Sequence, residues 1–554
     1  MRQFISIVVL FIQIIIIVFF RKSLYSSRKF DLFFWTVSTI TPFFLPENKT
    51  LFYTSSLGQR FYVYIGLEVH CQIKSERKIF SAASAVGTHF LPNHCVDFLD
   101  TACPGTLPVL NRSAIEQGIR MGLALKGVVN AYCIFDRKHY FYPDNPAGYQ
   151  ISQQRYPLVE QGEVCIVVAA YASIPRYEKI IRIHRLHLEQ DAGKSLHDSS
   201  TRSLIDFNRA GVGLMEIVSQ CDLSSPEEAA AYVEHIQRIA RYTKTSDADM
   251  EKAQMRFDVN ISVTQESGVL GTRVEIKNMN SVRFLKTALY YEISRQIEYL
   301  EQEKLFPQET RGFDAKEGIT FSMRSKEEAQ DYRYFPDPDL PTVCIERALV
   351  EKIQSTLPEL FDEKRNRFMK TFQLSEYDSF VLTEVLEVAE FFEATLNAIP
   401  KALFESKKTA FSKTAANWII GPLFSILIHK EHIQQEVRFS PHEFAEFVVC
   451  VTEKTISTPM AKEIFQEMLT QGGSFQDIIQ TKKMNAQSLT QDDLMDIIKE
   501  VHVEYPQQVK QYLSGKDKLI MFFLGQTMKK LAGRGDPEHL QNMWKRYLKT
   551  LDKT

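Results

Sequence analysis

Apolar residues recur at every second position in several stretches of the first half of this 554-residue chain, and at every third or fourth position after Pro341. Between Phe61 and Ile73 hydrophobic and polar side chains alternate, which is typical of a strand with one buried face. Similar stretches follow at residues 164–169, 179–188, 255–263 and 272–277. The later helical spacing is shown by Leu382, Val385, Leu386, Ala389, Phe392 and Leu396. The first half is therefore predicted to be mixed α+β and the second half helical.

Two long helices are predicted inside the first half. Ser225, Pro226 and Glu228 combine an N-cap, a proline at the first helical position and a capping-box glutamate, so a helix should run from there to about Tyr242. A second helix is expected at about residues 281–303. The length of the chain exceeds the size at which a single core keeps growing, so several domains are expected.

Charge and cysteine usage exclude some classes of protein. The formal net charge of −2 argues against coating nucleic acid by charge alone, so any nucleic-acid site must be local. The end of the chain is its basic part, because after Gly515 nine Lys and Arg residues stand against four acids. The eight cysteines form no C-x-x-C pair, which argues against a zinc knuckle or a disulfide framework. We expect free thiols in a reducing compartment.

The N-terminus differs from the rest of the chain. Residues 4–20 are almost unbroken apolar, interrupted by Ser6 and Gln13, and a basic, acid-poor stretch follows. That length is borderline for a membrane span, and the basic stretch is typical of an organellar transit segment. Three interpretations of residues 1–58 stay open: a removable leader, a membrane anchor, or a misassigned start.

Two short patterns are candidates for chemistry. Glu68 and His70 share one face of a strand and could hold a cation together, although a polar pair without a ligand is the more common meaning of this pattern. His187, Glu189 and Asp191 also share a face if the strand continues that far. Oxygen ligands of this type suit Mg²⁺, which leaves coordination positions for nucleotide phosphates.

Several known motifs are absent from the sequence. Gly193, Lys194 and Ser195 imitate the end of a P-loop, but Leu188 stands where a Walker motif needs glycine. Metalloprotease, serine hydrolase and complete dinucleotide-binding motifs are missing as well. Any use of ATP must therefore rely on another fold. Two strands offer polar faces that suit a charged substrate and a metal, or that are only solvated: Arg256, Asp258, Asn260 and Ser262 on one, and Arg273, Glu275 and Lys277 on the other.

Taken together, these segments resemble one family, the B subunit of the heterotrimeric GatCAB amidotransferase. The similarity follows the family's order and covers nearly everything after residue 58. Its segments are YIGLEVHCQI (64–73), CPGTLPVLN (103–111), FDRKHYFYPDNPAGYQISQ (135–153), LHLEQDAGKSLHD (186–198), LIDFNRAGVGLMEIVS (204–219), MRFDVNISV (255–263), VEIKNMNSVRFL (274–285), ETRGFD (309–314), DYRYFPDPDLP (331–341) and FFLGQTMKKLAGRGDP (522–537).

The resemblance implies an ATP- and Mg²⁺-dependent activating subunit of glutamyl-tRNA(Gln) amidotransferase, a carbon–nitrogen ligase. Such a protein binds mischarged Glu-tRNA(Gln) and phosphorylates the γ-carboxyl of its glutamate, because an acyl phosphate carries a better leaving group than a carboxylate does. An amidase A subunit then supplies ammonia from glutamine, and a small C subunit wraps the A/B interface. No DNA partner is expected, and no membrane partner for the mature protein.

The resemblance also implies site residues. Those expected at the catalytic centre are Glu68, His70, Glu189 and Asp191, and those expected to hold the metal are Glu68, His70, Glu189 and Gln190. Many bacterial relatives carry glutamate where this chain has Gln190, so metal binding should weaken here unless Asp191 compensates.

Other residues are expected from charge and position. ATP contacts are expected at Lys194, Arg256 and Lys277, and tRNA contacts at Lys529, Lys530 and Arg534. The tail cations suit phosphates of the tRNA elbow, which position the RNA without specifying it, although a solvated helix face explains them too.

The expected fold is α+β: an antiparallel-sheet cradle at 59–345, a helical connector at 346–485, and a small helical, YqeY-like tRNA-binding tail at 486–554. The Glu-Gln-Asp form and NRAGVG (208–213) are more similar to mitochondrial members, so a mitochondrial matrix protein with a leader is expected. Two rivals stay open. One is a non-catalytic tRNA-binding scaffold of the same complex, hinted at by Gln190, and the other is a membrane-anchored metal-dependent hydrolase. Whether Asp-tRNA(Asn) is also a substrate is open at this point.

Overall fold

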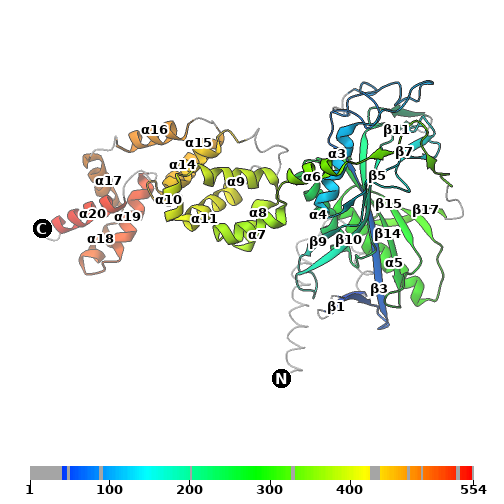
Figure 1. Cartoon of the computed structure of the whole chain (residues 1–554). Helices are drawn as coiled ribbons and strands as arrows, with labels where there is room; N and C mark the ends of the chain where they lie inside the picture. Colours follow the sequence, from blue (N-terminus) through cyan, green and yellow to red (C-terminus); the bar gives the residue numbers. More distant parts are fainter. Residues whose placement is uncertain are drawn as a thin grey trace. The chain divides into compact units, whose positions relative to one another are not determined.

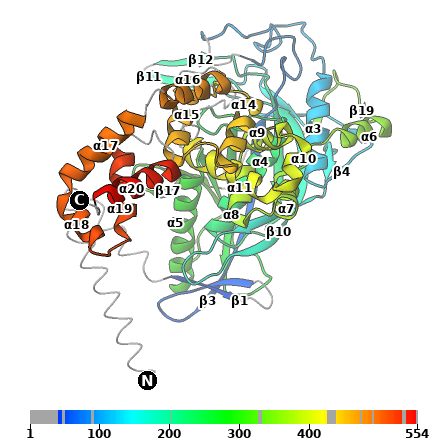
Figure 2. The same cartoon turned by 90° about the vertical axis from the view of Figure 1, so that its left-hand side faces the viewer.

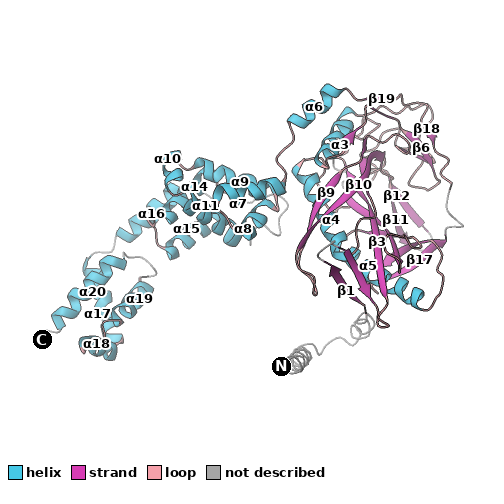
Figure 3. Cartoon of the chain, turned by 60° about the horizontal axis from the view of Figure 1, so that its bottom comes forward, coloured by secondary structure: helices cyan, strands magenta, loops and turns pink. Residues whose placement is uncertain are grey.

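The computed structural model describes residues 40–45, 50–86, 91–199, 202–325, 331–423, 437–470, 474–487, 491–531 and 537–551. The chain divides into two units, Met1–Pro358 and Glu359–Thr554, and many of their elements are labelled in Figure 1. Among the described residues, strands belong to the first unit and the second unit contains helices alone (Figure 3).

A twelve-stranded sheet is the frame of the first unit. Its central strand, β3 (Arg60–Gln72), pairs antiparallel with β13 (Gly213–Ser219) on one side and with β14 (Met255–Thr264) on the other. The main path runs β17-β16-β15-β14-β3-β13-β10-β8-β4. The further strands of this path are β4 (Val128–Val129), β8 (Val159–Glu160), β10 (Tyr177–Gln190), β15 (Val274–Met279), β16 (Glu309–Asp314) and β17 (Ile319–Ser325), and β9 (Glu163–Val168) pairs with β10 beside it.

Two helices cover one face of this sheet. Helices α4 (Pro226–Tyr242) and α5 (Val282–Glu301) pack against each other and against the strands (Figure 2). Because α5 connects β15 to β16, these two strands run parallel, whereas β3 and its two neighbours are antiparallel. Leu67 and Val69 of β3 are fully buried on the covered side, so the alternation of the strand places Glu68 and His70 on the other side.

The start of α4 follows the prediction with one difference. The side chain of Ser225 accepts a hydrogen bond from the backbone N–H of Glu228, as an N-cap should. The Glu228 carboxylate accepts a bond of 2.7 Å from the backbone N–H of Ser224. It also accepts bonds from Tyr177 and Lys179, which draw it away from the N-cap residue. The reciprocal half of the capping box therefore falls one residue earlier than predicted.

Smaller elements lie beside the large sheet. Helix α3 (Arg112–Ala124) packs against β4, β8 and β10, and α6 (Arg347–Ser355) packs against α3. The small sheets are β11 (Lys194–Ser199) with β12 (Arg202–Asp206), β18 (Phe335–Pro336) with β6 (Asp136–His139) and β7 (Tyr149–Ser152), and β19 (Val343–Cys344) with β5 (Tyr132–Cys133). Strand β7 also packs against β10, which brings β6 near the end of β10.

An N-terminal hairpin belongs to the fold of the first unit. Strands β1 (Thr41–Leu45) and β2 (Thr50–Thr54) pair with each other, and β2 continues onto the start of β3. Phe44 stacks on Tyr177 with ring centroids 4.5 Å apart. The hairpin thus lies within the segment that the sequence assigns to a leader, while the apolar run near the start of the chain lies outside the described residues.

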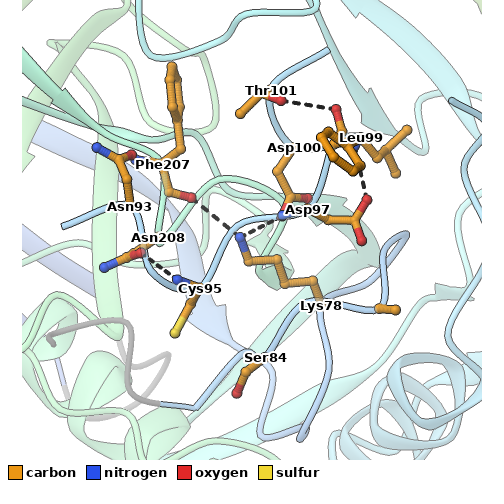
Figure 4. Close-up of polar contacts among 12 residues, drawn as sticks. Lys78, Ser84, Asn93, Cys95, Asp97, Leu99, Asp100, Thr101, Phe207 and Asn208 are labelled. Atoms are coloured by element: carbon orange, nitrogen blue, oxygen red, sulfur yellow. Dashed lines mark hydrogen bonds and ion pairs between the residues drawn. The ribbon is translucent and has the colours of Figure 1, made fainter. Parts of the chain in front are cut away.

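A buried ion pair joins a loop to the core of the first unit (Figure 4). Nζ of Lys78 is 2.8 Å from Oδ2 of Asp100, and the exposed fractions of the two side chains are 0% and 2%. Lys78 also donates to the backbone carbonyl of Phe207 at 3.3 Å. Four residues after Phe207, the backbone N–H of Gly211 donates a hydrogen bond to the backbone carbonyl of Asp191. The ion pair therefore supports the segment that holds Asp191.

Gly211 is required at its position. Its φ is +79°, and a Cβ atom there would lie 2.7 Å from Oδ1 of Asp100. Both the left-handed backbone and the close approach of the Asp100 carboxylate exclude a side chain at this point.

The second unit has two separate cores. The first is built from α7 to α16 around Phe392, Phe411 and Phe444, and the second from α17 to α20 around Trp544. The described helices of the second unit are α7 (Phe361–Phe372), α8 (Glu376–Thr383), α9 (Leu386–Ala398), α10 (Lys401–Ser406), α11 (Lys408–Trp418), the π-helix η3 (Ile419–Leu423), α14 (Pro441–Thr452), α15 (Thr458–Thr470), α16 (Phe475–Gln487), α17 (Gln491–Glu504), α18 (Pro506–Leu513), α19 (Leu519–Lys530) and α20 (Pro537–Leu551).

The predicted α+β class is confirmed, with a sheet domain followed by helices. The predicted strand at residues 61–73 is β3, and the predicted long helices are α4 and α5. The domain borders near 58, 345 and 485 stay predictions. Within the described ranges, no helix combines the length and the apolar character that crossing a membrane requires.

Candidate metal and phosphate site

Strand pairing collects polar side chains on the face of the sheet away from α4 and α5. His70 of β3 lies opposite Glu216 of β13 and Arg256 of β14. Glu68 lies opposite Asp258 in the adjacent row. Directly opposed residues of paired strands point to the same side, so segments far apart in the sequence meet here.

The first group of possible ligands consists of His70, Glu189 and Glu216, all buried. Nε2 of His70 is 3.3 Å from Oε2 of Glu216 and 3.7 Å from Oε1 of Glu189. His187 of β10 lies opposite Glu216, and its Nε2 is also 3.3 Å from Oε2 of Glu216. Two imidazoles therefore face one carboxylate oxygen, and their Nδ1 atoms have no hydrogen-bond partner in the part of the chain that the structure describes.

Electrostatic interactions in the first group favour positive charge. Burial raises the pKa of Glu216, but His187 and His70 lower it well below its ordinary value. Burial lowers the pKa of His70, but the Glu216 carboxylate brings it above its ordinary value. These carboxylates therefore stabilise a cation between them, whether an imidazolium or a metal ion.

The second group consists of Glu68, Asp258 and Glu275, whose carboxylate oxygens lie within 4.8 Å of one another. Lys277 follows Glu275 by two residues on β15 and shares its face. Its Nζ is 2.9 Å from Oε1 of Glu275 and 3.4 Å from Oδ2 of Asp258. Asn260 donates a hydrogen bond of 2.9 Å from Nδ2 to Oε1 of Glu68. This group is therefore made of carboxylates with a lysine ammonium among them.

The two groups act on each other through their charges. Burial raises the pKa of Glu68, and the negative charges of Glu216 and Asp258 raise it further. Carboxylates of both groups thus act on the pKa of Glu68, so the two groups form one electrostatic site.

Arg256 is held next to this site by Asp191. Nη1 of Arg256 donates to Oδ1 of Asp191 at 3.2 Å, and Nε of Arg209 lies 3.5 Å from Oδ2 of the same carboxylate. The charge of Asp191 raises the pKa of Arg256 against the effect of burial, and Glu189 and Asp258 add to the rise. Asp191 therefore holds the guanidinium of Arg256 where a carboxylate from each group raises its pKa.

Lys138 of β6 and two tyrosines that precede β18, Tyr332 and Tyr334, lie near the first group. Nζ of Lys138 on β6 lies 5.1 Å from the centre of the Tyr332 ring. Tyr332 is in turn in contact with Tyr334, with ring centroids 5.9 Å apart. Burial lowers the pKa of Lys138, but the charges of Glu189 and Glu216 bring it above its ordinary value. A second cation thus lies close to the carboxylates of the first group.

The structure separates several residues that the sequence places together. His70 and Glu189 belong to the first group and Glu68 to the second. Gln190 follows Glu189 on β10, so strand alternation turns its side chain to the other face, and its carbonyl accepts a bond of 2.7 Å from Nε2 of Gln150. Lys194 begins β11 and is exposed, and none of its described contacts reaches either group. The metal and ATP assignments of these residues stay predictions.

The donor sets fit divalent cations. Carboxylate oxygens, as in the second group, suit Mg²⁺ and Mn²⁺. The imidazole of His70 adds a nitrogen ligand to the first group, which suits Mn²⁺ or Zn²⁺ better than Mg²⁺. The partnerless Nδ1 atoms of His70 and His187 leave the choice of ring tautomer free, so Nε2 of His70 can present its lone pair to a metal ion.

One ligand candidate, Glu216, was not identified from the sequence, and two others, Asp258 and Glu275, were not assigned to the metal ligands. Glu216 is the one charged residue of the apolar strand GLMEIVS, which is a signal that could have identified it. Asp258 and Glu275 were seen as members of polar strand faces. Grouping them requires the register of the strands, that is, which residues of neighbouring strands lie opposite each other, and the sequence alone does not provide it.

The predicted tRNA contacts in the tail differ in their surroundings. Lys529, the second-to-last residue of α19, is exposed. Lys530 is held by two carboxylates of α17, at 3.3 Å from Glu500 and 3.2 Å from Glu504. Arg534 lies outside the described residues.

Comparisons with known proteins agree with this architecture. The model of the GatB/GatE catalytic domain matches residues 63–351, and the GatB domain model matches residues 402–548. The chain is 45% identical over 486 residues to the aspartyl/glutamyl-tRNA(Asn/Gln) amidotransferase B subunit of Rickettsia conorii, which covers 87% of this chain and 97% of that protein. It is 44% identical over 498 residues to the corresponding protein of Rickettsia bellii, covering 89% and 99% of the two chains. The chain therefore belongs to the GatB/GatE family, the B subunits of tRNA-dependent amidotransferases.

Proposed function

We propose that this chain activates mischarged Glu-tRNA(Gln) by ATP-dependent phosphorylation of the γ-carboxyl of its glutamate, so that ammonia can convert it to Gln-tRNA(Gln). The observation that carries the proposal is the placement of two carboxylate groups and Arg256 on one face of the sheet. Phosphoryl transfer to a carboxylate brings several negative charges together, so its site needs ligands for metal cations and a positively charged side chain.

The residues have distinct proposed roles. The carboxylates of the second group, and His70 with Glu189 and Glu216 of the first, would hold divalent metal ions. Such an ion, when bound, neutralises charge on a transferring phosphoryl group. Arg256, oriented by Asp191, presents a planar guanidinium that suits phosphate or carboxylate oxygens.

The partners of this proposal follow from the family. Because the Rickettsia relatives are named as B subunits, we propose two protein partners for this chain: an amidase A subunit that releases ammonia from glutamine, and a small C subunit. The name of these relatives covers both Asp-tRNA(Asn) and Glu-tRNA(Gln), and we propose the second as the substrate here.

The proposal is tested by co-expressing the full chain with its A and C partners and assaying Gln-tRNA(Gln) formation with and without ATP. ATP-dependent product with Glu-tRNA(Gln) supports it, and a parallel reaction with Asp-tRNA(Asn) defines the substrate range. If the assembled complex hydrolyses glutamine but forms no product, the non-catalytic scaffold takes the place of the proposed activity.

The tail provides a matched pair of lysines for tRNA binding. Lys529→Ala should weaken tRNA binding about uniformly across tRNA sequences, because an exposed lysine is free to contact a phosphate. Lys530→Ala should change it less, since Glu500 and Glu504 already neutralise that ammonium. Filter binding at two salt concentrations measures both. Equal effects of the two substitutions would show that the ion pairs of Lys530 open when tRNA binds.

We also propose a mitochondrial matrix location, supported by the basic, acid-poor segment near the start of the chain. A fluorescent fusion of the first 58 residues tests it. Retention of the fusion outside mitochondria would overturn this location.

A further inference from the structure

The second carboxylate group already contains a cation from the chain itself. Lys277 forms ion pairs of 2.9 Å with Glu275 and 3.4 Å with Asp258, and these are two of the three carboxylates that could hold a metal ion. In the first group the described ion pairs of Glu189 and Glu216 are with histidines, which can become neutral metal ligands. A lysine ammonium has no lone pair and cannot become a ligand.

We propose that Lys277 is an exchangeable counterion of the second metal site: a divalent cation entering between Glu68, Asp258 and Glu275 displaces its ammonium, which then binds a phosphate of the nucleotide. This inference rests on the proposed function, because it assumes that the site receives ATP with a divalent cation. It adds to the proposed function that the second cation and the phosphates of the nucleotide bind together.

Charge requires the displacement. An ammonium and a divalent cation cannot share the oxygens of Asp258 and Glu275 without strong repulsion, since both would lie within a few ångströms of the same atoms. The flexible side chain of Lys277 allows the ammonium to move while β15 stays paired with β14 and β16. Once released, the ammonium is an unpaired positive charge beside the site, and phosphate is the anion that enters with the metal.

The exchange has a thermodynamic consequence. Without nucleotide, the cation must compete with Lys277, so the second site binds weakly. With nucleotide, the displaced ammonium gains a phosphate partner, so each ligand raises the affinity for the other by the same factor. Lys138 and Arg256 lie near the first group, but no described ion pair joins either of them to Glu189 or Glu216, so the first group should bind its cation more tightly than the second when nucleotide is absent.

Mn²⁺ titration of the full-length chain, followed by electron paramagnetic resonance of the free ion, tests the exchange. Wild type should show one stronger and one weaker site, and ADP should strengthen the weaker one. In Lys277→Met the weaker site should bind at least about tenfold more tightly without nucleotide, and ADP should add less, because the competing charge is gone. Asp258→Asn in the Lys277→Met background should abolish the gain.

Two further variants serve as controls. Lys286→Met removes a lysine that is paired with Glu227 at 3.1 Å on the covered side of the sheet, and it should leave both Mn²⁺ affinities unchanged. Lys277→Arg keeps the positive charge, so its second site should bind Mn²⁺ as weakly as that of wild type. If Lys277→Met does not fold, tighter binding of Mn²⁺ by Lys277→Arg would contradict the proposal. Unchanged or weaker Mn²⁺ binding in a folded Lys277→Met chain would overturn the proposal. The titration needs no tRNA, so a failure of the amidation assay is distinguishable from a failure of the exchange.

Discussion

Under the proposed function, replacing Glu216 by glutamine is expected to abolish formation of Gln-tRNA(Gln) while glutamine hydrolysis by the proposed amidase partner continues. Oε2 of Glu216 is the atom that both His70 and His187 face at 3.3 Å. Glutamine keeps the shape but removes the charge and places an amide among the imidazoles. Loss of a supporting group alone typically costs about 10–100-fold in metal affinity, and a lost ligand should cost at least as much. Mn²⁺ binding and the amidation rate measure the effect.

Glu227→Gln is the matched control for this substitution. The side chains of Glu216 and Glu227 are 11% and 12% exposed, and Glu227 pairs with Lys286 away from both groups. The control should keep Mn²⁺ binding and amidation. Wild-type amidation by a folded Glu216→Gln complex would remove the first group from the proposed site.

Replacing Lys78 by methionine should lower the free energy of unfolding of the first unit by about 3–5 kcal/mol, because Asp100 would keep a buried charge without a counterion. Methionine fills a similar volume, so the effect reports the charge rather than a cavity. Hydrogen exchange of the β3 and β13 amides in increasing urea measures it, since these central strands open with the whole unit.

A surface pair and a double variant separate the possible causes. Lys74 and Asp247 form a pair of 2.6 Å whose side chains are 57% and 54% exposed, so Lys74→Met should cost less than about 1 kcal/mol. Adding Asp100→Asn to Lys78→Met removes the uncompensated charge and should restore much of the stability. Equal costs for the buried and exposed lysines would contradict the argument.

Much of the fold could be predicted from local patterns in the sequence. Alternation located β3 and β14, and the cap at Ser225 located the start of α4, because these signals depend on residues near one another in the sequence. The N-terminal hairpin was missed, since the basic and apolar composition before residue 58 suggested a targeting segment. Its burial depends on Tyr177, which is distant in the sequence.

Only part of the candidate site could be predicted from the sequence. Glu68 and His70 were identified together because they share a strand face, but the structure divides them between two groups. That division depends on which neighbouring strand supplies the other carboxylates. β13 brings Glu216 to His70, and β14 brings Asp258 to Glu68. Strand order and register are properties of the whole sheet, and a single sequence without its relatives does not fix them.

The central position of β3 also sets the order in which the protein can be assembled during synthesis. The strand is complete at Gln72, but its partners end at Ser219 and Thr264, and β2 pairs with only its first two residues. At about 5–20 residues per second, the ribosome needs roughly 10–40 s to make the second partner. Until β13 is complete, both edges of β3 lack most of their pairing, and one edge waits longer for β14; an unpaired edge strand is a site at which chains can aggregate. The histidine-containing group cannot form before Glu216 has left the ribosome, and the all-carboxylate group waits for Glu275.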